Sequence, residues 1–574
     1  MDNASLARVS SDIGDLLEIK GANPFKIRAY RNAADIIDHT AERVAHLTEA
    51  DVRGIPGIGK DLAAKIRELV DTGELIYFDA LRQEFPASIL DMLRLQGVGP
   101  KTVGLLYAEL GIETLEELEA AASDGRLRQL KGMGAKKEQL LLRSLAEHRS
   151  HVGRHLVGRT DAIATRLTEY LRMEAPEATI FPVGSLRRGR ETCGDIDLLA
   201  VNATDALMPH FTRFPDVERI LGQGPTKSSA LLRGGVQVDL RVAAAESAGA
   251  AAQYFTGSKA HNIAVRDIAL QRGLKLNEYG LFRVADGEYV AGAAESDVYE
   301  ARGLAYVPPE LREHRGEIAA AATRSLPHLV ERSDLRGDLH SHTTATDGKT
   351  DVETMATAAR DAGLEYLAIT DHSQALAMAN GLDERRALAH ATHIREVNAR
   401  LEGITLLAGI ECDIRADGTL DLADDCLAEL DLVVASVHSA FGQGAQQMTD
   451  RLLRAIDSPF VDIIGHPTGR LLLRRDPYAL NLEQVLDAAA RCGVAMEINS
   501  QIHRLDLSDS HARLARDREV KLVISTDAHA PAAFELLRWG VTVARRAWLE
   551  PGDVLNTLGA EDLRASLRRH RVTG

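Results

Sequence analysis

The sequence predicts a multidomain protein with a helical amino-terminal region, a central α+β region and a carboxy-terminal α/β region. Three observations predict this division. A glycine-bearing turn recurs three times before residue 140, and each copy precedes a helical pattern. Apolar residues alternate with period two between about residues 178 and 243, and after residue 334 strand and helix patterns alternate seven times. At 574 residues, the chain is also too long for a single core.

The recurring turns are residues 55–60, 95–100 and 130–135, and each contains two glycines separated by one apolar residue. Such glycines let backbone N–H groups at a helix start point outward, as in a helix-hairpin-helix, so they can bind a DNA phosphate. The formal net charge of -16 argues against a broad basic surface, so we expect DNA contacts to be local. The predicted contact residues are Gly57, Gly59, Lys60, Gly97, Gly99 and Lys101.

Residues 23–31, NPFKIRAYR, precede the first turn. Together they resemble the small amino-terminal domain of family X DNA polymerases, the family of DNA polymerase beta. The resemblance implies that Lys26 is a 5′-phosphate ligand and that Lys65 occupies the place of the sugar-phosphate lyase nucleophile of some members. A lysine can attack an abasic aldehyde if its pKa is depressed. The alternative for Lys65 is a solvated lysine on a helix face.

Acidic residues gather on the period-two strands of the central region. Asp195 and Asp197 share one face of a strand because side chains alternate, and Asp239 lies on a later strand. Three carboxylates on one sheet face repel one another unless cations neutralise them, as two-metal phosphoryl transfer requires. We therefore predict a nucleotidyltransferase palm that uses Mg²⁺ or Mn²⁺ and binds nucleotide phosphates through a nearby turn. The predicted nucleotide ligands are Gly184, Ser185 and Arg188 of the segment GSLRRG, residues 184–189, and Gly194, which directly precedes Asp195.

Residues 254–262, YFTGSKAHN, follow these carboxylates and resemble the sugar-facing segment of family X polymerases. The resemblance covers roughly residues 1–318. It implies that Tyr254, Phe255 and Gly257 belong to the nucleotide site, with the two aromatic rings against the deoxyribose. It also implies that Asn262 and Arg266 contact the incoming base and the template side. The alternative is an ordinary aromatic core strand followed by a turn.

In the last third, histidines and carboxylates recur at the carboxyl ends of the expected strands. Parallel strands joined by helices form a barrel or a doubly wound sheet, and in a barrel the strand ends converge on one mouth. Imidazole and carboxylate ligands without thiolates suit Mn²⁺ or Zn²⁺ in a catalytic role. Clustered cations would favour phosphoester hydrolysis. The predicted ligands are His340, His342, Asp347, His372, Glu411, His438, His466, Asp527 and His529.

The motif series H-x-H, T-D-H-S, G-I-E, S-V-H, G-H-P and T-D-A-H resembles the PHP (polymerase and histidinol phosphatase) domain over about residues 335–574. The resemblance implies a distorted (β/α)7 barrel that holds about three metal ions. The segment GHPTGR, residues 465–470, looks like that of the polymerase-linked branch of the family. Arg470 is therefore a candidate ligand for substrate phosphate.

Domain order over the whole length resembles that of bacterial family X polymerases. We expect a helical domain at 1–80, helical fingers at 81–150, a palm at 151–260, a thumb at 261–318, a linker at 319–334 and a PHP domain at 335–574. The expected function is gap-filling DNA polymerisation in DNA repair, including base excision repair, coupled to a metal-dependent 3′-5′ exonuclease. Abasic-site endonuclease activity is a further expectation for the PHP domain.

Two rivals remain open at this point. The PHP domain could be a small-molecule phosphatase of the histidinol-phosphate type, or an inactive polymerase half could tether a nuclease to DNA. The expected partners are gapped or nicked DNA and deoxynucleoside triphosphates, with no membrane partner and a monomeric chain. The sequence lacks a signal-peptide pattern, so the expected location is cytoplasmic and nucleoid-associated.

Overall fold

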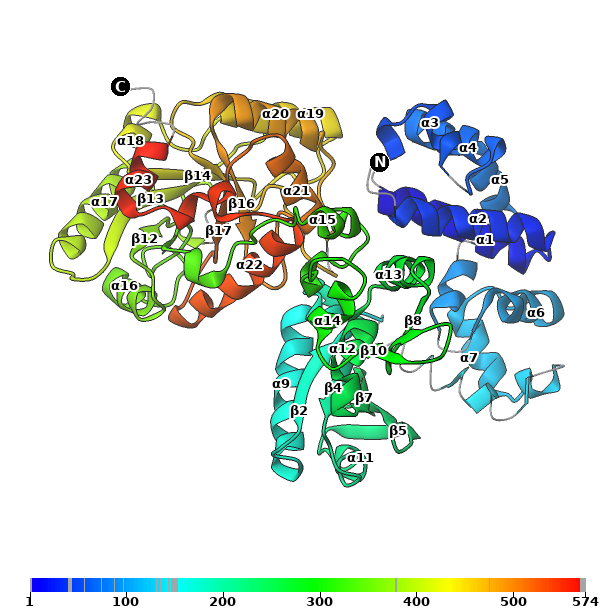
Figure 1. Cartoon of the computed structure of the whole chain (residues 1–574). Helices are drawn as coiled ribbons and strands as arrows, with labels where there is room; N and C mark the ends of the chain where they lie inside the picture. Colours follow the sequence, from blue (N-terminus) through cyan, green and yellow to red (C-terminus); the bar gives the residue numbers. More distant parts are fainter. Residues whose placement is uncertain are drawn as a thin grey trace.

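The computed structural model in Figure 1 describes residues 3–39, 44–55, 57–73, 75–86, 88–95, 98–130, 133–134, 137–139, 141–142, 145, 153–376, 379–473 and 475–567. Amino-terminal helices, a palm and thumb, and a carboxy-terminal barrel follow one another along the chain (Figure 1). Within these ranges, no helix has the length and apolarity needed to cross a membrane.

The amino-terminal region is helical and has its own apolar core, which includes Leu16, Ala33 and Val103. Gly59 and Gly99 are the N-cap residues of α4 and α6, so the first two glycine turns each lead into a helix, as predicted. Gly97 lies outside the described residues. The helices are α1 (Asn3–Ile19), α2 (Pro24–His39), α3 (Glu49–Gly54), α4 (Lys60–Thr72), α5 (Ile76–Gln83), α6 (Pro100–Leu110) and α7 (Leu115–Ser123).

The palm is a five-stranded mixed sheet with the order β2-β4-β7-β6-β5. β4 and β7 are parallel and the other neighbouring strands are antiparallel. Apolar side chains of α9, such as Leu167 and Leu171, share a core with Ile196 and Leu198 of β4. The elements are β1 (His155–Leu156), α9 (Val157–Glu174), β2 (Thr179–Val183), α10 (Gly184–Arg187), β3 (Thr192–Cys193), β4 (Asp195–Val201), α11 (Leu207–Phe211), β5 (Val217–Gln223), β6 (Lys227–Leu232) and β7 (Gln237–Ala243).

The thumb joins helices to a three-stranded antiparallel sheet with the order β10-β9-β8. The expected boundary after residue 260 falls inside α13. The expected linker 319–334 is packed rather than loose, because Ala321, Leu329 and Val330 are buried. The elements are α12 (Ala248–Thr256), α13 (Lys259–Gln271), β8 (Leu274–Asn277), β9 (Gly280–Arg283), β10 (Tyr289–Ala291), α14 (Glu295–Glu300), η5 (Pro309–Leu311) and α15 (Glu317–Thr323).

The carboxy-terminal region is a seven-stranded parallel barrel whose strands follow in sequence order from β11 to β17. A parallel bridge between Ser341 and Ala528, three residues beyond β11 and β17, links the segments that follow the first and last strands, so the barrel is nearly closed. The elements are β11 (Gly337–Asp338), α16 (Val352–Asp361), β12 (Tyr366–Ile369), α17 (Glu384–Asn398), β13 (Thr405–Asp413), α18 (Asp424–Ala428), β14 (Leu432–Ser436), α19 (Ala445–Asp457), β15 (Ile463–Ile464), α20 (Leu482–Cys492), β16 (Ala495–Asn499), α21 (Asp509–Asp517), β17 (Leu522–Ser525), α22 (Leu537–Arg546) and α23 (Ala560–Ser566).

One apolar cluster covers the barrel with its last helix, and another joins the barrel to the thumb. Leu563 of α23 and the following Leu567 share an apolar cluster with barrel-strand residues such as Tyr366 and Val434. Trp548, which follows α22, is buried in the apolar core of the thumb. The barrel is therefore packed against the polymerase-like half of the chain.

Candidate active sites

Three carboxylates meet on one face of the palm sheet. The parallel register of β4 and β7 places Asp197 opposite Asp239, and Asp195 lies two residues earlier on the same face. Lys227 of β6 reaches this group, because its Nζ lies 2.6 Å from Oδ2 of Asp239. The structure thus brings together the three residues that the sequence predicts as palm metal ligands.

Gly184 brings its backbone against this group. Its φ is +65°, and a Cβ built at this position would lie 2.5 Å from Oδ2 of Asp197. A side chain here would be strained by the left-handed backbone and would also collide with the carboxylate. Gly184 and Ser185 are the first two residues of α10, directly after β2, so the start of this helix lies beside the carboxylates, where the sequence predicts a phosphate-binding turn.

The carboxylates carry charge that a cation would stabilise. Burial, together with the charges of Asp195 and Asp239, raises the pKa of Asp197 to about 6. Burial, followed by the charge of Asp239, also raises the pKa of Asp195. For Asp239, burial works in the same direction, but hydrogen bonds led by that from Lys227 lower the pKa on balance. This arrangement fits divalent cations, whose positive charge offsets the repulsion.

The other predicted nucleotide ligands of the palm flank the carboxylates. Ser185 is half-buried on α10, and Gly194 directly precedes β4. The guanidinium of Arg188 donates to the Thr256 carbonyl at 2.5 Å and pairs with Glu313 at 3.1 Å. Arg188 is thus held by the thumb in this structure, and its contact with phosphate stays a prediction.

Two basic residues near the carboxylates were not predicted from the sequence. Arg154 donates to Oγ1 of Thr192 at 2.7 Å, and its charge acts on Asp195. Lys227 pairs with Asp239 as described above. Both come from segments outside the acidic motifs, and only the folded sheet brings them to the carboxylates.

The aromatic segment ends a helix and does not form the strand considered as its alternative. Tyr254 and Phe255 lie in the last turn of α12, with their rings in an edge contact at 5.1 Å, and the Tyr254 side chain is exposed. Gly257 follows with a φ of +70°. Asn262 of α13 donates to the Tyr254 carbonyl at 2.6 Å, and Arg266 on the same helix is exposed. The exposed members of this segment are available to a ligand.

The amino-terminal lysines lie around an aromatic ring. Nζ of Lys26 and Nζ of Lys65 lie 4.6 and 4.5 Å from the centroid of the Tyr77 ring. Nζ of Lys65 also contacts Oδ2 of Asp61 at 2.5 Å. Burial would lower the pKa of Lys65, but hydrogen bonds led by that of Asp61 raise it on balance. A raised pKa disfavours the neutral amine that a lyase nucleophile needs.

The lysines of the glycine turns lie at helix starts. Lys60 is the first residue of α4 and Lys101 the second residue of α6, and both are exposed. Gly57 has a φ of +96°, which favours glycine at the turn. The two turns are thus each followed by a helix whose first turn carries an exposed lysine, as a phosphate contact requires.

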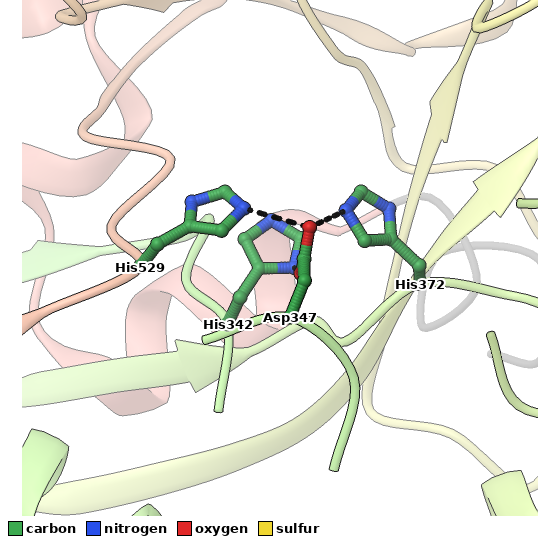
Figure 2. A group of neighbouring side chains, drawn as sticks. All are labelled: His342, Asp347, His372 and His529. Atoms are coloured by element: carbon green, nitrogen blue, oxygen red, sulfur yellow. Dashed lines mark ion pairs between the residues drawn. The ribbon is translucent and has the colours of Figure 1, made fainter. Parts of the chain in front are cut away.

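All nine predicted metal ligands of the barrel converge. Figure 2 shows an Asp347 oxygen between the rings of His372 and His529, with His342 beside them. The Nε2 atoms of His372 and His529 lie 3.5 and 3.4 Å from Oδ2 of Asp347. Three overlapping groups have donor atoms close enough to share an ion: His342, Asp347, His372 and His529; His340, His342 and Asp527; and His372, Glu411 and His438. His466 joins them through Glu411, with Nε2 3.0 Å from Oε1.

The donor atoms fit divalent cations. Within the described residues, several of them are buried and make no hydrogen bond: Nε2 of His340 and Nδ1 of His342, His438 and His466. A buried polar atom without a partner is costly, and coordination to a cation removes that cost. The set contains imidazole and carboxylate donors only, which suits catalytic cations.

Burial and neighbouring charges shift the pKa values of the cluster residues. Burial opposes protonation of His372, but Glu411 and Asp347 raise its pKa to about 10. Burial and the neighbouring His372 lower the pKa of His342 to about 4. Burial would raise the pKa of Glu411, yet the histidines around it hold the pKa well below the ordinary value. Glu411 is thus an anion at the centre of the cluster.

Two further carboxylates orient the cluster and were not predicted. Oε1 of Glu497 on β16 lies 2.8 Å from Nδ1 of His340. Asp371 accepts from the Thr343 backbone N–H at 2.8 Å and from Thr346 Oγ1 at 2.5 Å, so it holds the loop that carries Asp347. A carboxylate in a run of buried apolar residues, as in VAMEINS, is the signal that could have identified Glu497.

The two arginines near the cluster have different surroundings. Arg470 is buried, pairs with Glu191 of the palm at 3.0 Å and donates to the Leu505 carbonyl. Arg504 was not predicted, yet its Nε lies 3.9 Å from Oδ2 of Asp527, and its charge lowers the pKa of His466 after the effect of burial. Arg504 is therefore the arginine that faces the metal ligands.

The chain matches four family models: a helix-hairpin-helix domain at residues 1–75, a SAM-like helix-hairpin-helix tandem at 89–147, the DNA polymerase beta thumb at 251–313 and the PHP domain at 338–501. It is 36% identical over 573 residues to the DNA polymerase/3′-5′ exonuclease PolX of Bacillus subtilis, covering 99% of this chain and 100% of that protein. A probable phosphatase of Shewanella sediminis is 34% identical over 209 residues, which is 35% of this chain and 79% of that protein. A probable phosphatase of Thermoanaerobacter is 29% identical over 233 residues, which is 38% of this chain and 89% of that protein.

Proposed function

Because this chain belongs to the PolX family of DNA polymerase/3′-5′ exonucleases, we propose that it fills short gaps in DNA and trims 3′ ends during repair. The observation that carries the proposal is the presence of two separate acidic centres in one chain. One is the carboxylate group of β4 and β7, and the other is the imidazole and carboxylate cluster at the barrel mouth. The relative from Bacillus subtilis has both activities in its name.

In the palm, Asp195, Asp197 and Asp239 would hold Mg²⁺ or Mn²⁺ and Gly184 would leave room for the triphosphate. When bound, these cations lower the pKa of the attacking 3′-hydroxyl and offset charge on the triphosphate. The exposed Tyr254 presents an aromatic face to the sugar, and Arg154 adds positive charge beside Asp195. The glycine turns at Gly57 to Lys60 and Gly99 to Lys101 would bind the phosphates of gapped or nicked DNA.

In the barrel, the nine predicted ligands would hold about three Mn²⁺ or Zn²⁺ ions. When bound, these cations activate water and offset charge on the phosphoester. Glu497 fixes the ring of His340 through Nδ1, which directs Nε2 toward the cluster. Arg504, rather than Arg470, is placed to bind a substrate phosphate beside the cluster.

The test measures two activities on a gapped duplex with a labelled 3′ end. Asp239→Ala is expected to abolish nucleotide incorporation and retain 3′ trimming, because Asp239 belongs only to the palm centre. Glu411→Gln is the matched reverse variant, expected to lose trimming and retain incorporation. Wild-type protein that hydrolyses histidinol phosphate but not the DNA end would instead support a small-molecule phosphatase. Trimming without any incorporation by the wild type would support the DNA tether.

A further inference from the structure

A cavity of about 270 Å³ is lined by residues of both the palm and the barrel, and none of the lining residues is a predicted metal ligand. Its palm wall is formed by residues 190–192, and its barrel wall includes Arg470 and the start of α21 at residues 508–511. Arg315, which precedes α15, and Arg546 of α22 also line the cavity. α15, α21 and α22 lie near the junction of the two halves in Figure 1.

The lining is rich in arginine. Arg190, Arg315, Arg470 and Arg546 contribute four positive charges, against the carboxylates of Glu191 and Asp509. Asp509 pairs with both Arg315 and Arg546, at 3.1 and 2.8 Å. A guanidinium group binds phosphate oxygens through two parallel N–H donors, so this excess of arginine favours a phosphate ligand.

The guanidinium of Arg190 has N–H donors that no acceptor of the described residues occupies. Its side chain is 41% exposed, and the one carboxylate oxygen within ion-pair distance, among the described residues, is Oε1 of Glu313 at 4.0 Å. That oxygen also contacts Arg188 and Arg546 at 3.1 Å each. Within the same residues, the Arg190 guanidinium makes no hydrogen bond, so an anion in the cavity would be its first close partner.

The cavity is connected by short stretches of chain to both active sites. Arg190 precedes Asp195 of the palm by five residues, and Arg470 follows His466 of the barrel by four. Burial lowers the pKa of Arg154, and the charge of Arg190 lowers it further. The charge of Arg154 in turn acts to lower the pKa of Asp195, so Arg154 is electrostatically coupled both to the cavity and to the palm. The lining of the cavity is therefore continuous along the chain with segments of both centres.

We propose that this cavity binds a phosphodiester of the DNA strand whose 3′ end moves between the palm and the barrel. The proposal rests on the proposed function, since it needs both activities in one molecule. The ligand is a nucleotide phosphate, which has two sources: a DNA strand or a free mononucleotide released by trimming. The strand is the occupant we commit to, because the lining combines segments of the palm and the barrel and contains no metal ligand of either centre.

Ser510→Glu provides the test. Ser510 is exposed at the first turn of α21, where an acidic side chain favours the helix, so the fold is expected to remain stable. The added negative charge would repel a phosphate in the cavity. Ser510→Gln is the matched control, with the same side-chain length and no charge.

The assay presents a mismatched 3′ end on gapped DNA, together with excess trap DNA, and measures removal and extension without dissociation. Ser510→Glu is expected to lower the yield of this coupled reaction by about tenfold, as a like charge near a bound phosphate does. Extension of a matched end and hydrolysis of thymidine 5′-monophosphate p-nitrophenyl ester should match the wild type. Arg190→Ala should lower the coupled yield in the same way.

Three outcomes would overturn the proposal. Coupled yields at the wild-type level for both Ser510→Glu and Ser510→Gln would exclude a phosphate in the cavity during coupling. Weaker binding of thymidine 5′-monophosphate by Ser510→Glu with an unchanged coupled yield would assign the cavity to the free mononucleotide. A similar loss in Ser510→Gln would mean that the side chain acts by packing. Failure of the proposed function is distinguishable, because wild-type protein would then fail matched-end extension or ester hydrolysis.

Discussion

Replacing Gly184 with alanine is expected to disable polymerisation while leaving the fold in place. The new Cβ would lie 2.5 Å from Oδ2 of Asp197, whereas ordinary contacts begin at 3.4 Å, so the carboxylate must retreat by the difference, about 0.9 Å. Mg²⁺ demands nearly ideal ligand geometry, and a displacement of about 1 Å at a reacting centre costs about a hundredfold in rate. The left-handed backbone adds about 1 to 2 kcal/mol of strain.

The assay is single-nucleotide incorporation on a gapped duplex, with 3′ trimming by the same preparation as an internal reference. We expect kcat for incorporation to fall by about a hundredfold and trimming to stay at the wild-type rate. Gly273→Ala is the matched control, because Gly273 has a φ of +70° but no atom within 4 Å of its Cβ position. Incorporation by Gly184→Ala at close to the wild-type rate would refute the role assigned to this close approach.

Three other changes test separate parts of the molecule. Glu497→Gln should reduce trimming and barrel metal content by about 10 to 100-fold, because it weakens the support of His340, and elemental analysis with a trimming assay checks this. Arg504→Ala should raise KM for trimming while Arg504→Lys recovers part of the loss, and an equal effect of Arg470→Ala would contradict the assignment of Arg504 as the phosphate ligand. Glu313 is held among arginines. Burial would raise its pKa, but attraction to Arg546 and Arg188 outweighs burial and lowers the pKa from 4.5 to about 2. This shift corresponds to about 3 kcal/mol of stability. That stability is present above pH 4.5 and is lost as the pH falls toward 2. Glu313→Gln should therefore unfold at a lower temperature than the wild type at pH 7, and the difference should shrink at acid pH. A difference that stays constant with pH would contradict this linkage.

The residues that sequence reasoning placed well follow simple periodicities. Strand alternation puts Asp195 and Asp197 on one face, and the repeated strand-to-helix pattern puts His340, His438 and His529 at one barrel mouth. These relationships depend on the local period and on the topology of parallel strands, both of which are visible in the sequence.

The surroundings that the sequence does not reveal depend on contacts between distant segments. Arg470 follows a metal-ligand motif, yet the folded chain pairs it with Glu191 of another domain. Arg504 has no motif of its own and reaches Asp527 only through the loop after β16. The proline-bearing stretch 319–334 has the composition of a linker, yet three of its apolar residues, Ala321, Leu329 and Val330, are buried in the structure.

The burial of Trp548 in the thumb has a practical consequence for dissecting the protein. A polymerase fragment ending near residue 334 would leave an unfilled apolar socket, and a nuclease fragment starting there would expose the part of the Trp548 ring that now packs in the thumb core, with only Arg513 still lying over the ring. Truncations at that point would expose apolar surface on both fragments and favour their aggregation. Point variants of the intact chain are thus the sounder way to separate its two chemistries.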